Sequence, residues 1–191
     1  MKAVVLNGAR GEDACLTGVL AVLVESLKAP GHDVDVLDLD GMSVADCRGC
    51  FGCWVKTPGV CVIHDDGLEA LRAVAQCDIL VFLSPVTFGG YSSVLKKGVD
   101  RLIGNILPYF VKAGSEIHHA PRYHRCLGLA AMGVQDSPCE EEARIFRALV
   151  SRNAINLQAA GHSSVVVTRD APEAAVALAI RYMLEEAGAE G

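Results

Sequence analysis

The stretch DILVFLSP, residues 78–85, decides the fold class. Its five consecutive apolar residues, Ile79 to Leu83, have the length of one strand, and Ser84-Pro85 ends the run. A short run that is apolar throughout is typical of a strand buried on both faces in a parallel sheet. We therefore expect a central parallel strand here, with helices before and after it.

Apolar runs of strand length alternate with helical patterns on both sides of this stretch. The other predicted strands cover residues 2–6, 33–39, 126–132 and 164–168. Apolar residues at helical spacing predict helices over 15–27, 66–75 and 94–103, and from 137 and 170 onward. This alternation predicts one α/β domain over residues 1–191, a flavodoxin-like three-layer sandwich with parallel strand order 2-1-3-4-5. The segment 104–125 is expected to be an excursion beside the carboxyl edge of the sheet.

The composition excludes several classes of protein. The chain has 191 residues, a formal net charge of −6 and no block of Lys and Arg, which argues against a nucleic-acid surface. The apolar run after Met1 is too short for a signal peptide, and no run approaches the roughly 20 apolar residues of a membrane span. We therefore expect a cytoplasmic protein. Eight cysteines in that reducing compartment indicate metal, cluster or redox chemistry.

A cysteine-rich loop at 47–61 holds half of these cysteines in the spacing C-x2-C-x2-C-x7-C. They are Cys47, Cys50, Cys53 and Cys61. The first three match a ferredoxin-like spacing, with a fourth ligand further along, so the loop predicts a [4Fe-4S] cluster on four thiolates. A structural zinc ion and a loop of unmetallated, redox-active thiols are the alternatives.

The loop after the first predicted strand is a candidate phosphate site. Small residues there let backbone N–H groups and a helix N-terminus face an anion, although Glu12 is acidic and no hydroxyl comes before Thr17. The candidate residues are Gly8, Ala9, Arg10, Asp13 and Ala14. The alternative is an ordinary β-α turn.

Two later loops should reach the same edge of the sheet and hold a flavin ring. After the third predicted strand, backbone donors face the polar edge of the ring, and Phe88 or Tyr91 lies against it. The candidates are Ser84, Pro85, Val86, Thr87, Phe88 and Gly89. Gly133, in the loop after the fourth strand, is expected to close the other side. Plain turns whose aromatic side chains belong to the core are the alternative.

Three histidines, His118, His119 and His124, lie within seven residues. They suit a metal or a proton relay near the flavin, but the preferred interpretation is a set of ordinary loop residues. Arg122 and Arg125 beside them are candidates for contact with the phosphates of a nicotinamide cofactor.

Several of these segments together carry a family resemblance. They are CRGCFGC (47–53), GVCVIHDD (59–66), DILVFLSPVTF (78–88) and LKKGVDR (95–101). In this order they resemble the NADPH-dependent FMN reductases of flavodoxin-like fold, and especially the iron–sulfur flavoproteins among them. The resemblance covers roughly residues 1–135 and is strongest from 47 to 101.

The resemblance implies noncovalent FMN, with its phosphate on residues 8–14 and its ring on 84–90, and a four-iron cluster on the four cysteines. It also implies a homodimer or homotetramer with the flavin near a subunit interface. The predicted function is an FMN-dependent oxidoreductase that exchanges electrons between FMN and the cluster, with NAD(P)H as a possible donor and a small molecule or a protein as redox partner. The alternatives are a cluster-free NAD(P)H-dependent FMN or quinone reductase and a zinc-stabilised α/β binding module.

Overall fold

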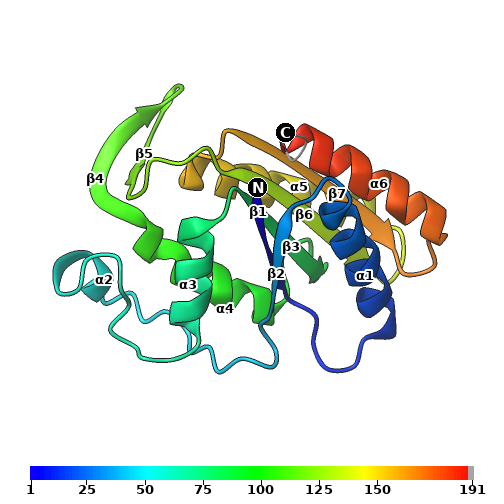
Figure 1. Ribbon diagram of the computed structural model, residues 1–191, viewed down its shortest axis with the longest axis horizontal. Coiled ribbons are helices and arrows are strands. Elements are labelled where there is room, and N and C mark those ends of the chain that lie inside the picture. Colours follow the sequence, from blue (N-terminus) through cyan, green and yellow to red (C-terminus); the bar gives the residue numbers. More distant parts are fainter. Residues whose placement is uncertain (189–191) are drawn as a thin grey trace.

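The computed structural model describes residues 1–188 and has a five-stranded parallel sheet at its centre (Figure 1). The strands are β1 (Lys2–Asn7), β2 (Asp33–Asp38), β3 (Ile79–Pro85), β6 (Gly128–Gln135) and β7 (Gly161–Thr168). They lie in the order β2-β1-β3-β6-β7, and every neighbouring pair is parallel. Since β4 and β5 stand outside this sheet, its strands counted along the chain follow the order 2-1-3-4-5. The predicted flavodoxin-like sandwich is therefore confirmed.

Helices cover both faces of the sheet. α1 (Ala14–Lys28) and α6 (Glu173–Glu186) pack side by side on one face. α3 (Gly67–Gln76), α4 (Ser93–Arg101) and α5 (Glu140–Leu157) cover the other. A short helix, α2 (Gly52–Val55), lies in the cysteine loop, and the 3-10 turn η1 (Leu102–Asn105) follows α4. Within residues 1–188, no helix is long and apolar enough to cross a membrane.

The residues of β3 alternate between two apolar cores. Ile79, Val81 and Leu83 pack into the core under α1 and α6. Leu80 and Phe82 pack into the core under α3, α4 and α5, and all five side chains are fully buried. Because β3 lies between β1 and β6, the loop after it leaves from the middle of the carboxyl edge. In sheets of this type ligands bind at that edge.

The excursion at 104–125 is largely a β-hairpin and lies elsewhere than predicted. β4 (Ile106–Ala113) and β5 (Glu116–Pro121) pair antiparallel and project from the body (Figure 1). The hairpin follows η1 at the end of α4, and the chain then returns to the start of β6. Beyond the hairpin, the Arg125 guanidinium binds Asp78, which precedes β3. These positions belong to the amino edge of the sheet, because α4 runs back from the carboxyl edge. The prediction of a carboxyl-edge excursion was wrong.

β6 ends later than its apolar pattern predicted. It pairs with β7 without interruption from Gly128 to Gln135, whereas the predicted strand ended at Met132. Gly133 therefore lies inside a strand. An added Cβ there would meet Val86 at 2.9 Å and the ring of Phe146 at 3.2 Å, so close packing requires glycine at this position.

Candidate functional site

The four cysteines of the loop at 47–61 line one small cavity of about 20 Å³, room for about one water-sized sphere. Cys53 on α2 is buried, Cys47 and Cys61 are half-buried, and Cys50 is exposed. Burial, followed by the neighbouring thiols of Cys61 and Cys47, raises the pKa of Cys53. Four crowded thiols become thiolates more readily when they share a positive centre. The fold thus brings the four predicted ligands to one place.

The four thiols that line this cavity are suitable ligands for an iron–sulfur cluster, but the cavity itself, of about 20 Å³, is smaller than a cluster. Within residues 1–188, no three His, Cys, Asp or Glu side chains are arranged to hold a single metal ion as they stand. Ligands of a cluster surround the cluster's own iron and sulfide atoms, so they lie farther apart than ligands of one ion. Four cysteines are the usual ligand set. A cluster would need a wider space than this cavity, and Cys50 and Phe51 on the outer side of the loop are exposed to solvent.

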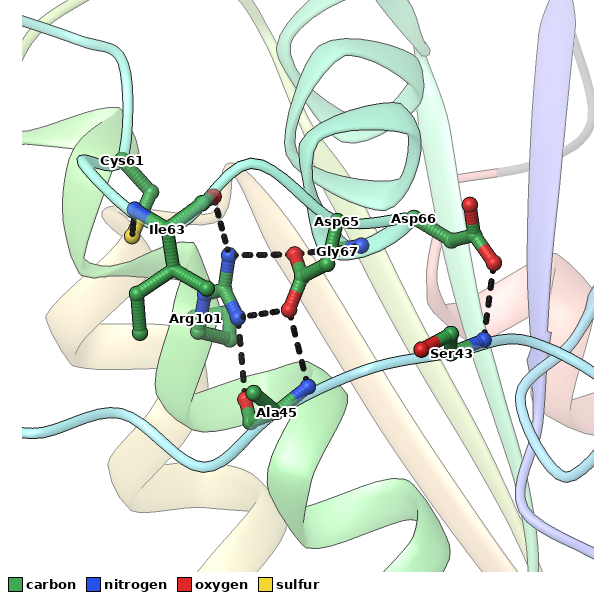
Figure 2. Close-up of polar contacts among 8 residues, drawn as sticks. All are labelled: Ser43, Ala45, Cys61, Ile63, Asp65, Asp66, Gly67 and Arg101. Atoms are coloured by element: carbon green, nitrogen blue, oxygen red, sulfur yellow. Dashed lines mark hydrogen bonds and ion pairs between the residues drawn. The ribbon is translucent and has the colours of Figure 1, made fainter.

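Arg101, the last residue of α4, anchors the cysteine loop from inside the protein (Figure 2). Its Nη2 and Nη1 atoms donate to Oδ1 and Oδ2 of Asp65 at 2.7 and 2.8 Å. The two side chains are only 1% and 10% exposed. Nη1 also donates to the carbonyl of Ala45 at 2.9 Å, and Nη2 to that of Ile63 at 3.3 Å. One buried guanidinium therefore ties the segment before Cys47 to the segment after Cys61.

The carboxylate of Asp65 also binds backbone N–H groups on both sides of the cysteine loop. It accepts the N–H groups of Ala45 at 2.9 Å and Gly67 at 3.1 Å (Figure 2). Close by, the N–H of Ile63 donates to the sulfur of Cys61 at 3.4 Å. Hydrogen bonding to Arg101 is the main cause of the lowered pKa of Asp65. The loop around Cys61 is thus held in place by the ion pair of Arg101 with Asp65 and by the backbone groups that these two side chains bind.

The lowered pKa of Asp65 predicts an acid-sensitive loop. Since its pKa in the folded state lies below the unfolded value of about 3.9, the carboxylate stabilises the fold above about pH 4. That contribution is lost as the pH falls through the depressed pKa. We expect the free energy of unfolding to decrease below about pH 4, and Asp65→Asn to show a shallower decrease. Urea unfolding at several pH values measures both, and equal slopes would exclude Asp65 as a source.

Aromatic rings join the cysteine loop to the hairpin. Trp54 on α2 stacks on Phe51 with ring centroids 5.0 Å apart and lies 4.8 Å from His119, which in turn is 4.7 Å from Phe110. The indole N–H donates to the carbonyls of Ile103 and Ile106 at 3.1 and 3.0 Å. The loop is therefore packed against η1 and β4 rather than free in solvent.

The three histidines do not converge on one site. His118 is buried, with Nδ1 on the Asn156 side chain and Nε2 on Glu116, both at 2.9 Å. His119 lies in the aromatic stack and its Nδ1 contacts the carbonyl of Leu107 at 2.8 Å, while His124 is exposed. These contacts agree with the preferred interpretation of ordinary loop residues.

The two arginines beside these histidines support the protein's own backbone. Arg122 donates from Nε to the carbonyl of Gly104 at 2.8 Å, and Arg125 binds Asp78 at 2.9 Å. Both lie at the amino edge of the sheet, away from the loops expected to hold the flavin. Their proposed contact with nicotinamide phosphates has no support in this geometry.

The first residues of the candidate phosphate loop pack tightly against α4. Gly8 donates its N–H to the carbonyl of Leu83 at 2.8 Å, and an added Cβ would meet the Cβ of Leu95 at 2.5 Å. Ala9 is buried and donates its N–H to the side chain of Asn7 at 3.1 Å. Gly8 and Ala9 therefore set the path of the loop, and their N–H groups are already bound inside the protein, so a phosphate here would be held by residues further along.

Carboxylates hold the next part of this loop. Asp13 caps α1 by accepting the N–H of Leu16 at 3.2 Å, and Asp40 accepts the N–H of Gly11 at 2.8 Å. Arg169, after β7, binds both oxygens of Asp13 at 2.8 and 2.9 Å and also contacts Asp136. Arg10 is exposed, and Ala14 is the first residue of α1. A phosphate arriving here meets the cations Arg10 and Arg169 but competes with Asp13.

The start of the loop after β3 is fixed by two buried serines. The Ser84 hydroxyl donates to the carbonyl of Pro85 at 2.8 Å and accepts the N–H of Ser92 at 2.9 Å. The Ser92 hydroxyl donates to the carbonyl of Gly8 at 2.6 Å and accepts the N–H of Leu95, so it also caps α4. Ser84 therefore supports the loop from within, and the hydroxyl of Ser92 joins the first and second candidate loops.

The tip of this loop presents one aromatic ring to solvent. Thr87 and Gly90 exchange two backbone hydrogen bonds, of 3.0 and 2.8 Å, across a turn that places Phe88 at φ 50° with 91% of its surface exposed. Val86 donates its N–H to Val134 on β6 at 2.8 Å, and the positive-φ Gly89 packs against Ile145. A phenylalanine in the left-handed region is uncommon, and at this place its ring is free to contact a ligand at the carboxyl edge of the sheet.

Tyr91 belongs to the core and not to this surface. Its ring packs edge-on against Phe82 and Phe146, with centroids 5.6 and 5.5 Å away, and its hydroxyl accepts a hydrogen bond from Asn153 at 2.9 Å. Burial raises the pKa of Tyr91 to about 12. Of the two aromatic residues expected beside the flavin, only Phe88 is accessible.

A parallel sheet of order 2-1-3-4-5 with candidate ligand loops at its carboxyl edge defines the flavodoxin-like class of α/β proteins. The chain belongs to the NADPH-dependent FMN reductase family, whose family model matches residues 1–119. Known structures agree on the fold. The chain is similar to the NAD(P)H:quinone oxidoreductase of Methanothermobacter marburgensis, with a TM-score of 0.73 and 14% identity over 95% of this chain and 96% of that one. It is also similar to an FMN-dependent NADH-azoreductase of Bacillus anthracis in complex with FMN, with a TM-score of 0.64 and 13% identity over 98% of each chain.

Curated relatives in sequence bear the name iron–sulfur flavoprotein. One from Archaeoglobus fulgidus is 29% identical over 101 residues, which are 53% of this chain and 48% of the relative. One from Methanocaldococcus jannaschii is 30% identical over 101 residues, which are 53% of this chain and 51% of the relative. The chain thus spans about half the length of the curated relatives it matches.

Proposed function

We propose that this protein is an FMN-dependent oxidoreductase that exchanges electrons between FMN and a [4Fe-4S] cluster held by Cys47, Cys50, Cys53 and Cys61. The observation that carries the proposal is the convergence of these four thiols on one cavity within an FMN reductase fold. The names of its sequence relatives support the same combination. When bound, FMN supplies hydride or two-electron chemistry and the cluster supplies single-electron transfer.

The flavin is proposed to lie along the carboxyl edge of the sheet. The exposed ring of Phe88 and the backbone of residues 84–90 would contact the isoalloxazine. The hydrogen bonds of Ser84 and Ser92 hold this loop in position for that contact. Arg10, Arg169 and the N-terminus of α1 would take the phosphate. Gly133 keeps β6 close to Val86 and so supports the loop from behind.

α4 links the two proposed sites. Its N-terminus follows the loop after β3, and its last residue, Arg101, lines the cysteine cavity. Nine residues at about 1.5 Å each separate these ends by about 13 Å. Electrons would cross this distance within one chain, or would cross a shorter distance between two chains if copies associate.

We propose that the protein forms a homodimer or homotetramer, and the exposed hairpin residues Tyr109, Phe110 and Ile117 support this proposal. We also propose a cytoplasmic location, where the thiols stay reduced.

A cluster-free NAD(P)H-dependent FMN or quinone reductase is the second candidate. The observation that favours it is the small size of the cysteine cavity, about 20 Å³. In that case the four thiols would serve only to position the loop. Flavin chemistry is common to both candidates, and iron content separates them.

Reduction by a nicotinamide cofactor tests the flavin part of the proposal. Protein loaded with FMN and kept free of oxygen should lose its flavin absorbance on titration with NADPH or NADH, with an end point near one equivalent per FMN, or near one and a half where a cluster also takes up one electron. The iron–sulfur part is tested separately by metal analysis. Failure to bind FMN, or bound FMN that neither nucleotide reduces, would contradict an NAD(P)H-dependent enzyme.

Asp13→Ser is expected to tighten FMN binding by about tenfold, equivalent to about 1.4 kcal/mol. Serine keeps the helix cap, while the change removes a negative charge beside the proposed phosphate position and frees Arg169 from its bidentate partner. Riboflavin, which has no phosphate, is the control and should bind both proteins within about twofold. Fluorescence titration measures both constants. An equal change for FMN and riboflavin would place the phosphate elsewhere.

A further inference from the structure

The guanidinium of Arg101 has one N–H donor that the protein leaves unused. Arginine carries five N–H donors in one plane. Two are taken by Asp65 and one each by the carbonyls of Ala45 and Ile63. The fifth, on Nε, is buried and has no hydrogen-bond partner within the described residues. A buried donor without a partner costs free energy, so this N–H is available to a ligand.

The same side chain lines the cysteine cavity. Asp65 lies on one side of the guanidinium and Cys61 on the other (Figure 2). Hydrogen bonding to Asp65, and then the nearby thiols of Cys61 and Cys47, raise the pKa of Arg101. A permanent positive charge with a spare donor therefore borders the space where the four sulfurs meet.

We infer that Arg101 donates its Nε–H to a sulfur atom of the cluster bound by the four cysteines and raises the reduction potential of that cluster. The inference rests on the proposed function. Reduction transfers one electron from the reduced flavin to the cluster and makes or breaks no bond at the cluster, so the reduced cluster carries one more negative charge. A buried cation and an N–H···S hydrogen bond both stabilise the more negative state.

Arg101→Lys tests this role while the ion pair is kept. Lysine retains the positive charge and a bond to Asp65, but its stem has no donor at the position of Nε. We expect the variant to fold and to retain its iron. Its one-electron reduction should be about tenfold less favourable, a potential lower by about 59 mV. Redox titration followed by electron paramagnetic resonance gives this value, and the flavin potential, at the far end of α4, is the internal control.

Asp65→Asn provides the opposite change. Removing the carboxylate leaves the charge of Arg101 uncompensated, so the cluster potential should rise. A merely loosened loop would move both variants in the same direction, whereas an electrostatic role moves them in opposite directions.

Each outcome decides a separate point. A lower potential in Arg101→Lys and a higher one in Asp65→Asn support the inference. An unchanged cluster potential in Arg101→Lys, or shifts of the same sign in the two variants, would overturn it while the proposed function stands. Wild-type protein that holds no iron when isolated without oxygen would overturn the proposed function and this inference with it.

Discussion

Cys50→Ser is expected to abolish binding of the cluster. Cys50 is one of the four thiols that line the cavity, and the hard oxygen of a serine hydroxyl is a much poorer ligand for cluster iron than a soft thiolate. Iron should fall from about four atoms per chain to well below one, and the FMN content should stay the same, because the loops proposed to hold the flavin lie at the other end of α4. Iron and flavin assays on the same anaerobic sample measure both.

Cys126→Ser is the matched control for this result. Cys126 is exposed like Cys50, but it lies just before β6 and outside the cysteine cavity. The control should retain all of its iron. Loss of iron from both variants would indicate nonspecific damage, and full retention in Cys50→Ser would contradict the assignment of this cysteine as a ligand.

Arg101→Met is expected to lower the free energy of unfolding by about 3–5 kcal/mol. The substitution leaves the carboxylate of Asp65, which is only 10% exposed, without its cation. It also leaves the carbonyls of Ala45 and Ile63 without the donors they now have. Urea unfolding of the protein without its cofactors measures the loss directly.

Two further variants separate the buried ion pair from general effects of losing a charge. Lys96 is also on α4, but its pair with Asp100 is exposed, with 54% and 44% of the side-chain surfaces accessible. Lys96→Met should therefore cost less than about 1 kcal/mol. Combining Arg101→Met with Asp65→Leu removes both charges and should recover the part of the stability that the uncompensated carboxylate costs, whereas the backbone groups bound by the pair stay without partners. A double variant as unstable as Arg101→Met alone would show that the uncompensated carboxylate is not the cause.

The central sheet could be predicted because its strands are buried on both faces. Ile79 to Leu83 has to be apolar throughout, since its alternate residues enter two different cores. The ends of the strands were less predictable. Pairing between β6 and β7 extends β6 through Gly133 to Gln135, and the contact between Gly133 and Phe146 that permits this depends on α5.

The hairpin was missed although its sequence carries a signal. Residues 106–113, ILPYFVKA, form a mostly apolar run, but Pro108 argues against a regular strand. The structure resolves this conflict with a shift of register between Ile106 and Phe110, so the proline lies at the irregular part of the pairing. Gly114 then turns the chain with a positive φ of 60°.

Sequence spacing identified the four cysteines that line the cavity but not the residue that anchors their loop. The spacing C-x2-C-x2-C-x7-C was enough to group Cys47, Cys50, Cys53 and Cys61, and the structure places all four around one cavity. Arg101 lies three residues after Gly98 and seven after Val94, on the buried face of α4, and a charge on an apolar helix face is the signal that was available. Its partner Asp65 is 36 residues away and could not be identified from spacing.

The carboxyl edge shows a similar limit. Glycine and small residues marked the first loop as a candidate phosphate site, which stays a prediction, but the ion pair between Asp13 and Arg169 beside it joins residues 156 positions apart. That ion pair places a negative charge where the family resemblance implies a phosphate. Asp13 and Arg169 come together only in the folded chain, so the loop sequence alone could not show that Arg169 is bound to Asp13.

The content of FMN, iron and acid-labile sulfide per chain, measured on one sample purified without oxygen together with its absorption spectrum, tests the two-cofactor proposal most directly. The proposal predicts about one FMN, four iron atoms and four sulfides, with a flavin spectrum on a broad brown background. FMN without iron or sulfide would contradict the cluster and leave a cluster-free reductase. A chain that binds no flavin, even after FMN is added, would contradict the proposed function as a whole.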